Sequence, residues 1–265
     1  MNKKILAVGC SYTKGHGLDK EIHDEKLWVN QLISDLYSNY SLVNLSDTGR
    51  NNQWIFSTAM SELIKNDYDL VLIGWSELER LNITVGLELY KTLTRLTGDV
   101  DIKINPHQTI KKEWLEDLGN RIRKITNAHC YLLDLVKYVN FLKTFQVDYK
   151  KSKILFVNSL LHISNDFFTK KAYTLPNEFD DTTKEIISIS SRSDEEIRML
   201  YDKIHNDYSE AGGIQEKYWL NLYQSLRSLQ IDDVSDIDKH PGYLSQEKYF
   251  KCLNPIFKEK MNANK

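Results

Sequence analysis

Residues that could carry out acyl transfer lie at two distant places in this 265-residue sequence. Ser11 stands in a polar turn, Gly9-Cys10-Ser11-Tyr12-Thr13, and His240 comes much later, preceded by Asp236 and Asp238. A serine hydroxyl becomes an effective nucleophile when a neighbouring base takes its proton, and a carboxylate holds a histidine base in the required tautomer. Together these residue types indicate attack on an ester or similar carbonyl through a covalent acyl-enzyme.

Such residues need a framework that brings them together, and the hydrophobic pattern predicts a parallel sheet. Apolar runs over 5–9, 42–45, 69–74 and 153–158 indicate buried strands. Apolar residues at helical spacing predict helices over about 24–39, 55–63, 114–145, 194–205 and 215–229, and a last helix with Ser245 as its N-cap. Strands alternating with helices are typical of a parallel sheet covered by helices.

Polar residues follow each of the first three strands, where the ligands of an open parallel sheet bind. The turn with Ser11 follows the first strand, residues 46–52 follow the second, and Trp75-Ser76 follows the third. The charged residues after the third strand, Glu77, Glu79 and Arg80, form either a local ion pair, which is the favoured interpretation, or part of the site.

In this order the blocks resemble the SGNH/GDSL hydrolase family, and in particular its divergent members with Trp-Ser or Trp-Thr after the third strand. The family's Gly-Asp-Ser block corresponds to Gly9-Cys10-Ser11, and its second-block glycine to Gly49. Its Gly-x-Asn-Asp block corresponds to Gly74-Trp75-Ser76-Glu77. The last block, usually Asp-x-x-His-Pro, stands here as Asp238-Lys239-His240-Pro241, one residue shorter.

The resemblance implies a three-layer α/β/α fold with a flavodoxin-like parallel sheet and helical insertions. It makes Ser11 the nucleophile, His240 the base and Asp238 the orienting acid, with Asp236 as the reserve acid. The backbone amides of Ser11 and Gly49 would then donate hydrogen bonds to the oxyanion.

One departure from the family pattern affects the chemistry directly, because the third block lacks its asparagine. Loss of one oxyanion donor costs about 10²–10³ in turnover. Ser76, Asn51 and Asn52 are the alternative donors, and the sequence does not choose among them. The candidate pocket residues are Tyr12, His16, Asn51 and Trp75, although an aromatic residue after a buried strand is as often part of the core.

The amino-acid composition excludes several classes of partner and site. The chain has 35 basic and 37 acidic side chains and a net charge of −2, which argues against a nucleic-acid partner. Three widely spaced cysteines indicate neither a disulfide framework nor a zinc site. The mechanism requires no metal or organic cofactor.

The expected organisation is a single domain over 1–265, with insertions at about 81–113 and 160–215. No apolar run approaches the ~18–20 residues of a membrane span. The apolar stretch 5–8 is too short for a signal peptide, so no membrane contact and a cytoplasmic location are expected.

These observations predict an esterase or deacylase acting on a small-molecule or glycan acyl ester. Two alternatives use the same site. A non-catalytic SGNH-like binding or assembly module is favoured by the missing third-block asparagine, and an O-acyltransferase would result if an alcohol or sugar replaced water.

Overall fold

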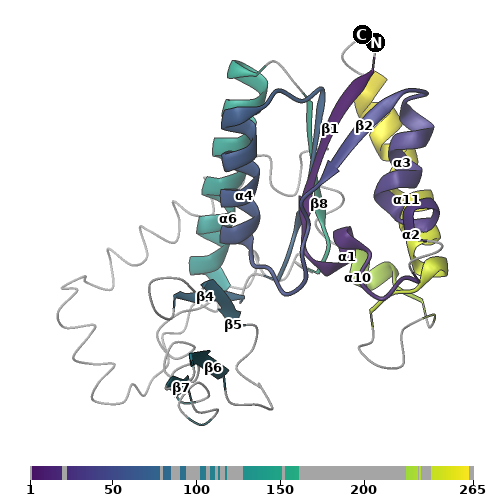
Figure 1. Ribbon diagram of the computed structural model, residues 1–265. Coiled ribbons are helices and arrows are strands. Elements are labelled where there is room, and N and C mark those ends of the chain that lie inside the picture. Colours follow the sequence, from purple (N-terminus) through teal and green to yellow (C-terminus); the bar gives the residue numbers. More distant parts are fainter. Residues whose placement is uncertain are drawn as a thin grey trace, which may run out of the picture.

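The central feature of the computed structural model is one four-stranded parallel sheet with the strand order β2-β1-β3-β8 (Figure 1). Its strands are β1 (Lys3–Gly9), β2 (Tyr40–Asn44), β3 (Leu70–Trp75) and β8 (Lys153–Asn158). The structure describes residues 2–19, 23–77, 80–84, 90–93, 102–105, 108–110, 113, 117, 128–150, 153–160, 225–231, 233 and 240–262. The predicted parallel α/β sheet is confirmed, and its order is that of a flavodoxin-like doubly wound sheet.

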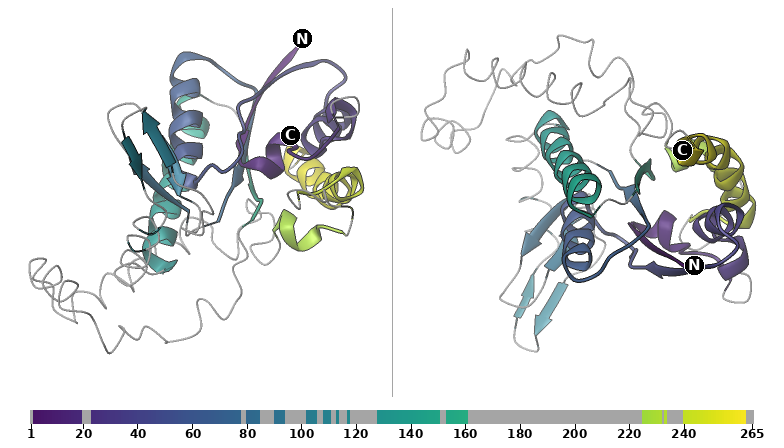
Figure 2. Two further views of the ribbon diagram at one scale, coloured as in Figure 1. Left: turned by 60° about the horizontal axis from the view of Figure 1, so that its bottom comes forward. Right: turned by 90° about the horizontal axis from the view of Figure 1, so that it is seen from above.

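Helices cover both faces of the sheet, which gives three layers (Figures 1 and 2). One face carries α4 (Asn52–Lys65) and α6 (Ala128–Lys143), which continues as the π-helix η1 (Thr144–Tyr149). The helices of the other face are α1 (Ser11–Lys14), α2 (His23–Lys26), α3 (Trp28–Leu36), α10 (Leu226–Leu229) and α11 (Tyr243–Asn262).

Burial on both faces explains why the inner strands are continuous apolar runs. Every residue of β3 is buried, and so are the last five residues of β1 and of β8. Side chains of these strands point alternately into two separate cores, one under α4 and α6 and the other under α3 and α11. The edge strand β2 alternates between half-buried and exposed residues.

Two predicted helices differ from the observed ones because of contacts with distant residues. The expected helix over 24–39 is two helices, with Leu27 in an extended conformation between them. The backbone N–H of Trp28 donates to Oε1 of Gln246 on α11 instead of to a preceding turn. Helix α11 begins at Tyr243, before the predicted cap Ser245, because the Asp233 carboxylate accepts hydrogen bonds from backbone amides of its first turn.

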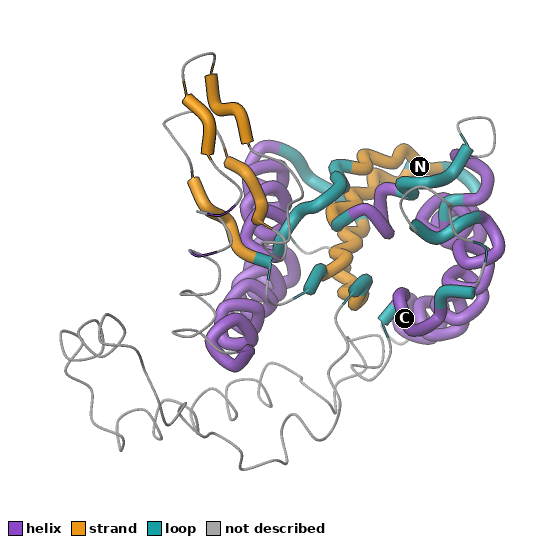
Figure 3. The backbone as a smooth tube through the Cα atoms, turned by 90° about the horizontal axis from the view of Figure 1, so that it is seen from below, coloured by secondary structure: helices purple, strands orange, loops and turns teal. Residues whose placement is uncertain are grey.

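Between residues 81 and 110 the insertion is not helical where the structure describes it, which corrects the expectation. It contains two antiparallel hairpins, β4 (Leu81–Thr84) with β5 (Tyr90–Leu93) and β6 (Ile102–Asn105) with β7 (Gln108–Ile110) (Figure 3). The physical reason is readable in the sequence, since apolar and polar residues alternate in Leu81-Asn82-Ile83-Thr84 and Ile102-Lys103-Ile104-Asn105. That period of two is typical of strands.

Several sequence-based predictions fall outside the described residues. They are the insertion over 160–215 beyond residue 160 and the helix over 194–205. Most of the helix over 114–145 before residue 128, and the helix over 215–229 before residue 225, also lie outside the described residues. The single-domain assignment of 1–265 therefore stays a prediction. None of the helices that the structure describes combines the length and hydrophobicity needed to cross a membrane.

Candidate functional site

The candidate nucleophile Ser11 begins a one-turn helix at the carboxyl end of β1. Its backbone carbonyl accepts hydrogen bonds from the amides of Gly15 and His16, so the turn closes tightly beneath it. Gly15 ends this helix in the left-handed conformation, with φ of 78°, which glycine adopts without strain. Ser11 is only 3% exposed, so the turn holds a serine in a confined position at the sheet edge.

Two glycines allow this turn to lie directly on the sheet. Gly9 and Gly74 are register partners on β1 and β3, and the buried Thr13 of α1 sits over both. A methyl group on Gly74 would come within 2.3 Å of Thr13 Oγ1 and 2.9 Å of Ser159 Oγ, and one on Gly9 within 2.4 Å of Thr13 Oγ1. The sequence pattern does not indicate Thr13 and Ser159. Their side chains lie so close to Gly74 that only a residue without a side chain fits at this position of the third block.

His240, from the far end of the sequence, packs against the same turn. Its ring lies edge-on to His16 with 4.6 Å between centroids, and 6.3 Å from the ring of Tyr12. The first and last blocks are thus brought together. The structure describes both Ser11 and His240, and no hydrogen bond joins these two side chains to each other. The two candidate acids, Asp236 and Asp238, lie outside the described residues.

The second-block glycine lies in the turn after β2 and has a left-handed conformation, with φ of 69° for Gly49. Nothing lies within 4 Å of the position of a Cβ there, so the backbone conformation and not crowding favours glycine. The turn is fixed to the first block because the amide of Asp47 donates to the carbonyl of Gly9. Among the described residues, no acceptor is bound to the Gly49 amide, which leaves this N–H available as a donor.

Asp47 links the first two blocks electrostatically. Its carboxylate accepts hydrogen bonds from Lys14 at 2.7 Å and from Nη2 of Arg50 at 2.5 Å. Burial opposes ionisation, but the hydrogen bonds from Lys14 and Arg50 outweigh it and lower the pKa of Asp47 from 3.8 to about 2. The carboxylate is therefore charged at neutral pH and holds the Gly49 turn against α1.

Asp47→Asn should destabilise the protein in a pH-dependent way. Since the folded-state pKa lies below the unfolded value, the stabilisation is present above about pH 4 and is lost as the pH falls toward 2. Allowing for solvent screening of this partly exposed group, we expect Asp47→Asn to lower the free energy of unfolding by about 1–2 kcal/mol at pH 7. Urea unfolding between pH 7 and 3 measures the difference, which should shrink below pH 4.

A matched control for that experiment is Asp134→Asn, which removes an exposed pair with Lys137 on α6. We expect it to change stability by less than about 0.5 kcal/mol at every pH. The stabilising role of the ionised Asp47 carboxylate would be contradicted if Asp47→Asn changed the free energy of unfolding as little as the control does. It would also be contradicted if the effect of Asp47→Asn grew as the pH fell.

The three alternative oxyanion donors have other partners or are enclosed. The side chain of Asn51 caps α4 by accepting from the amide of Trp54 and donates to the carbonyl of Arg80. The Asn52 carboxamide pairs with the backbone of Ser76 in both directions, at 2.7 and 3.2 Å. The hydroxyl of Ser76 is fully buried. These contacts fix the loop after β3 to the start of α4.

Two of the candidate pocket residues lie largely in the core. Trp75 is fully buried and stacks on Phe156, with 5.9 Å between ring centroids, which favours the core interpretation of this side chain. Tyr12 packs against Tyr249 and donates its hydroxyl hydrogen to Gln230 at 2.6 Å. Burial raises the pKa of Tyr12 to about 12, so the phenol is neutral at physiological pH. His16 is exposed, and its ring contacts that of His240.

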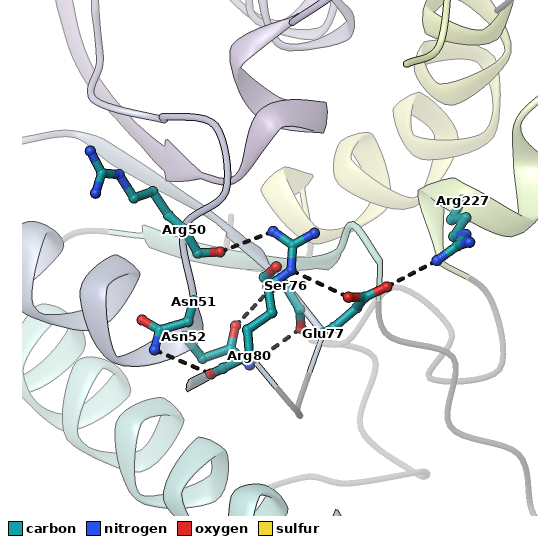
Figure 4. Close-up of polar contacts among 7 residues, drawn as sticks. All are labelled: Arg50, Asn51, Asn52, Ser76, Glu77, Arg80 and Arg227. Atoms are coloured by element: carbon teal, nitrogen blue, oxygen red, sulfur yellow. Dashed lines mark hydrogen bonds and ion pairs between the residues drawn. The ribbon is translucent and has the colours of Figure 1, made fainter. Parts of the chain in front are cut away.

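The ion pair predicted after the third strand is present between Glu77 and Arg80, and it extends to a distant element. Nε of Arg80 donates to Glu77 at 3.3 Å, and Arg227 of α10 donates to the same carboxylate at 2.9 Å (Figure 4). Nη1 of Arg80 also donates to the carbonyl of Arg50 at 3.3 Å. Sequence reasoning missed Arg227, because no local pattern signals a partner 150 residues away.

Cys10, which replaces the family's aspartate, is fully buried. Burial raises the pKa of its thiol, and the charge of Arg80 and the hydroxyls of Ser159 and Ser76 partly offset that effect. The thiol is therefore neutral and serves as a small buried side chain. Within the described residues, no group of three or more His, Cys, Asp or Glu side chains could hold a metal ion.

The sequence matches no protein-family model and no curated protein. The solved structures that are similar to this chain include TesA, EstA and Axe2. TesA is 13% identical with a TM-score of 0.47, covering 97% of this chain and 98% of TesA. The psychrotrophic esterase EstA from Pseudoalteromonas sp. is 13% identical with a TM-score of 0.46, covering 98% and 100%. Axe2, an acetylxylan esterase from Geobacillus stearothermophilus, is 11% identical with a TM-score of 0.44, covering 96% and 93%.

Proposed function

We propose that this chain is a serine hydrolase of small acyl esters, with Ser11 as the nucleophile and His240 as the base. The observation that carries the proposal is the packing of the His240 ring on the turn that begins at Ser11, 4.6 Å from the ring of His16. An imidazole packed on the turn that holds a serine supplies the two residue types needed for nucleophilic acyl transfer. Its location at the carboxyl edge of a parallel sheet agrees with where such sheets bind ligands.

The proposed reaction has two stages. Oγ of Ser11 attacks the acyl carbonyl while His240 takes its proton, and the amides of Ser11 and Gly49 donate to the resulting oxyanion. The intermediate collapses to an acyl-enzyme as the alcohol leaves with the proton from His240. Water, deprotonated by the same base, then releases the acid and restores Ser11. Asp238, with Asp236 in reserve, is the proposed orienting acid.

The substrate class follows from the confinement of the nucleophile. Ser11 is 3% exposed and the neighbouring Tyr12 is 7% exposed, so the described residues leave little room for a long acyl chain beside the hydroxyl. An O-acetyl or similarly small acyl group on a small molecule or glycan fits that confinement best. We therefore expect acetyl esters to be cleaved faster than esters of six-carbon or longer acids.

A covalent probe tests the proposal without knowledge of the natural substrate. A fluorophosphonate should label the wild-type protein at Ser11 and should fail to label Ser11→Ala, with His240→Ala labelled much more slowly. Ser34→Ala, which removes an exposed serine of α3, should be labelled like the wild type. A wild-type protein that is not labelled and hydrolyses no short-chain p-nitrophenyl ester would overturn the hydrolase and favour a binding module.

A further inference from the structure

Arg80 is a largely buried cation at the carboxyl edge of the sheet, following β3 by five residues. Its side chain is only 13% exposed, whereas Arg227, the other cation bound to Glu77, is 58% exposed. Placing a guanidinium out of water is costly unless a negative charge compensates it fully. If the protein's own acidic groups neutralise Arg80 only in part, its positive charge can interact with a negatively charged ligand.

The protein neutralises this charge only in part. Glu77 is 3.3 Å from Nε of Arg80 but 2.9 Å from Arg227, so the carboxylate is shared and its shorter contact is with the other arginine. The bond from Nη1 to the carbonyl of Arg50 is also long, at 3.3 Å. A guanidinium has five N–H donors, and in the described part of the chain Nη2 of Arg80 has no acceptor.

The partly neutralised charge contacts the turn that contains Gly49, one of the proposed oxyanion donors. The carbonyl to which Arg80 donates belongs to Arg50, the residue directly after Gly49. The charge of Arg80 also acts on Cys10, the residue before Ser11, since it lowers the pKa of that thiol against the larger, opposite effect of burial. Figure 4 shows the guanidinium between the Arg50 carbonyl and Glu77, next to Ser76.

The two asparagines of these loops are already engaged, and the hydroxyl of Ser76 is buried without a hydrogen-bond partner among the described residues. Asn51 caps α4, and Asn52 pairs with the backbone of Ser76. Arg80 is thus the described side chain of this loop that combines unused donors with a positive charge.

We infer that Arg80 is a catalytic residue that supplies the third, charged donor to the oxyanion formed at Ser11, in place of the asparagine missing from the third block. This inference rests on the proposed serine hydrolase. A guanidinium held by weak contacts can donate Nη2–H to the oxygen that becomes negative in the transition state, where a charged hydrogen bond is strongest.

Breaking the Glu77–Arg80 pair from either side tests the inference. With p-nitrophenyl acetate, Arg80→Met should lower kcat/KM by about 10²-fold, mostly in kcat. Glu77→Gln removes the same ion pair but leaves the cation less neutralised, so its kcat/KM should stay within about threefold of wild type or rise. Arg80→Lys should fall between the two. Millimolar guanidinium ion should restore activity to Arg80→Ala and leave the wild type unchanged.

The possible outcomes separate the inference from the proposed function. Equal losses in Arg80→Met and Glu77→Gln would show a structural ion pair and overturn the inference, as would full activity of Arg80→Met. If Arg80→Met melts below the assay temperature, Arg80→Lys and guanidinium rescue of Arg80→Ala decide the question at a lower temperature. A wild-type protein that no fluorophosphonate labels would overturn the hydrolase and the inference together. A labelled wild type whose Arg80 variants keep full activity would overturn the inference alone.

Discussion

Ser11→Ala should lower kcat for p-nitrophenyl acetate by at least about 10⁴-fold, because it removes the proposed nucleophile of the acyl-enzyme. His240→Ala should lower it to a similar extent, since the serine then lacks the base that activates it. The double variant should be barely slower than either single variant, because residues that act as one unit lose their effect together. Steady-state kinetics on the purified variants, with far-ultraviolet circular dichroism to confirm folding, measure the effect.

The control for that prediction is His16→Ala. Its ring contacts His240 at 4.6 Å but has no assigned proton-transfer role, so we expect a loss of about tenfold or less. Additive losses in the Ser11→Ala/His240→Ala double variant would contradict the joint action of the two residues. A Ser11→Ala protein with wild-type turnover would exclude Ser11 as the nucleophile.

Gly74→Ala should be the most destabilising conservative change at the site, costing about 3 kcal/mol. The added methyl group would lie 2.3 Å from Thr13 Oγ1 and 2.9 Å from Ser159 Oγ, both on buried residues. Thr13 has little freedom to move, because its side chain also contacts Gly9 across the sheet and its χ1 rotamer is restricted. Urea unfolding should show a lower midpoint, and a displaced α1 should also reduce serine labelling.

A double-mutant cycle identifies the cause of that loss. Thr13→Ala removes the closest atom, so Thr13→Ala/Gly74→Ala should be more stable than the sum of the single changes predicts by about 1 kcal/mol or more. Gly49→Ala is the matched control, since its methyl group meets nothing within 4 Å and only the left-handed backbone is strained. We expect Gly49→Ala to cost about 1–2 kcal/mol, and Thr13→Ala should not relieve it. Strict additivity for Gly74→Ala and Thr13→Ala would contradict the steric explanation.

Local patterns were sufficient for the elements that are buried on both faces. The apolar runs at 5–9, 69–74 and 153–158 predict β1, β3 and β8, since a strand covered by helices on both sides must be apolar throughout. Helix α4 follows from its period and from Asn51, whose side chain accepts from the amide of Trp54. The hairpins in 81–110 differ from the expected helical insertion, although the alternation of apolar and polar residues in their strands carries the signal for them.

Contacts between residues far apart in the sequence account for the other differences. The helix over 24–39 breaks at Leu27 because Gln246 takes the amide of Trp28, and no residue near Leu27 announces that partner. The start of α11 is likewise set by Asp233, ten residues before the first residue of the helix.

By itself, the sequence determined the parallel α/β sheet and the order in which the polar blocks follow its strands, because both depend on short-range hydrophobic period and turn residues. Only the tertiary structure decided which side chains that are distant in the sequence contact one another. It placed His240 on the turn of Ser11, set Thr13 against Gly74, and divided Glu77 between two arginines. The physical reason is that hydrogen bonding, desolvation and charge depend on distances across the folded chain, which residue type and spacing do not encode locally.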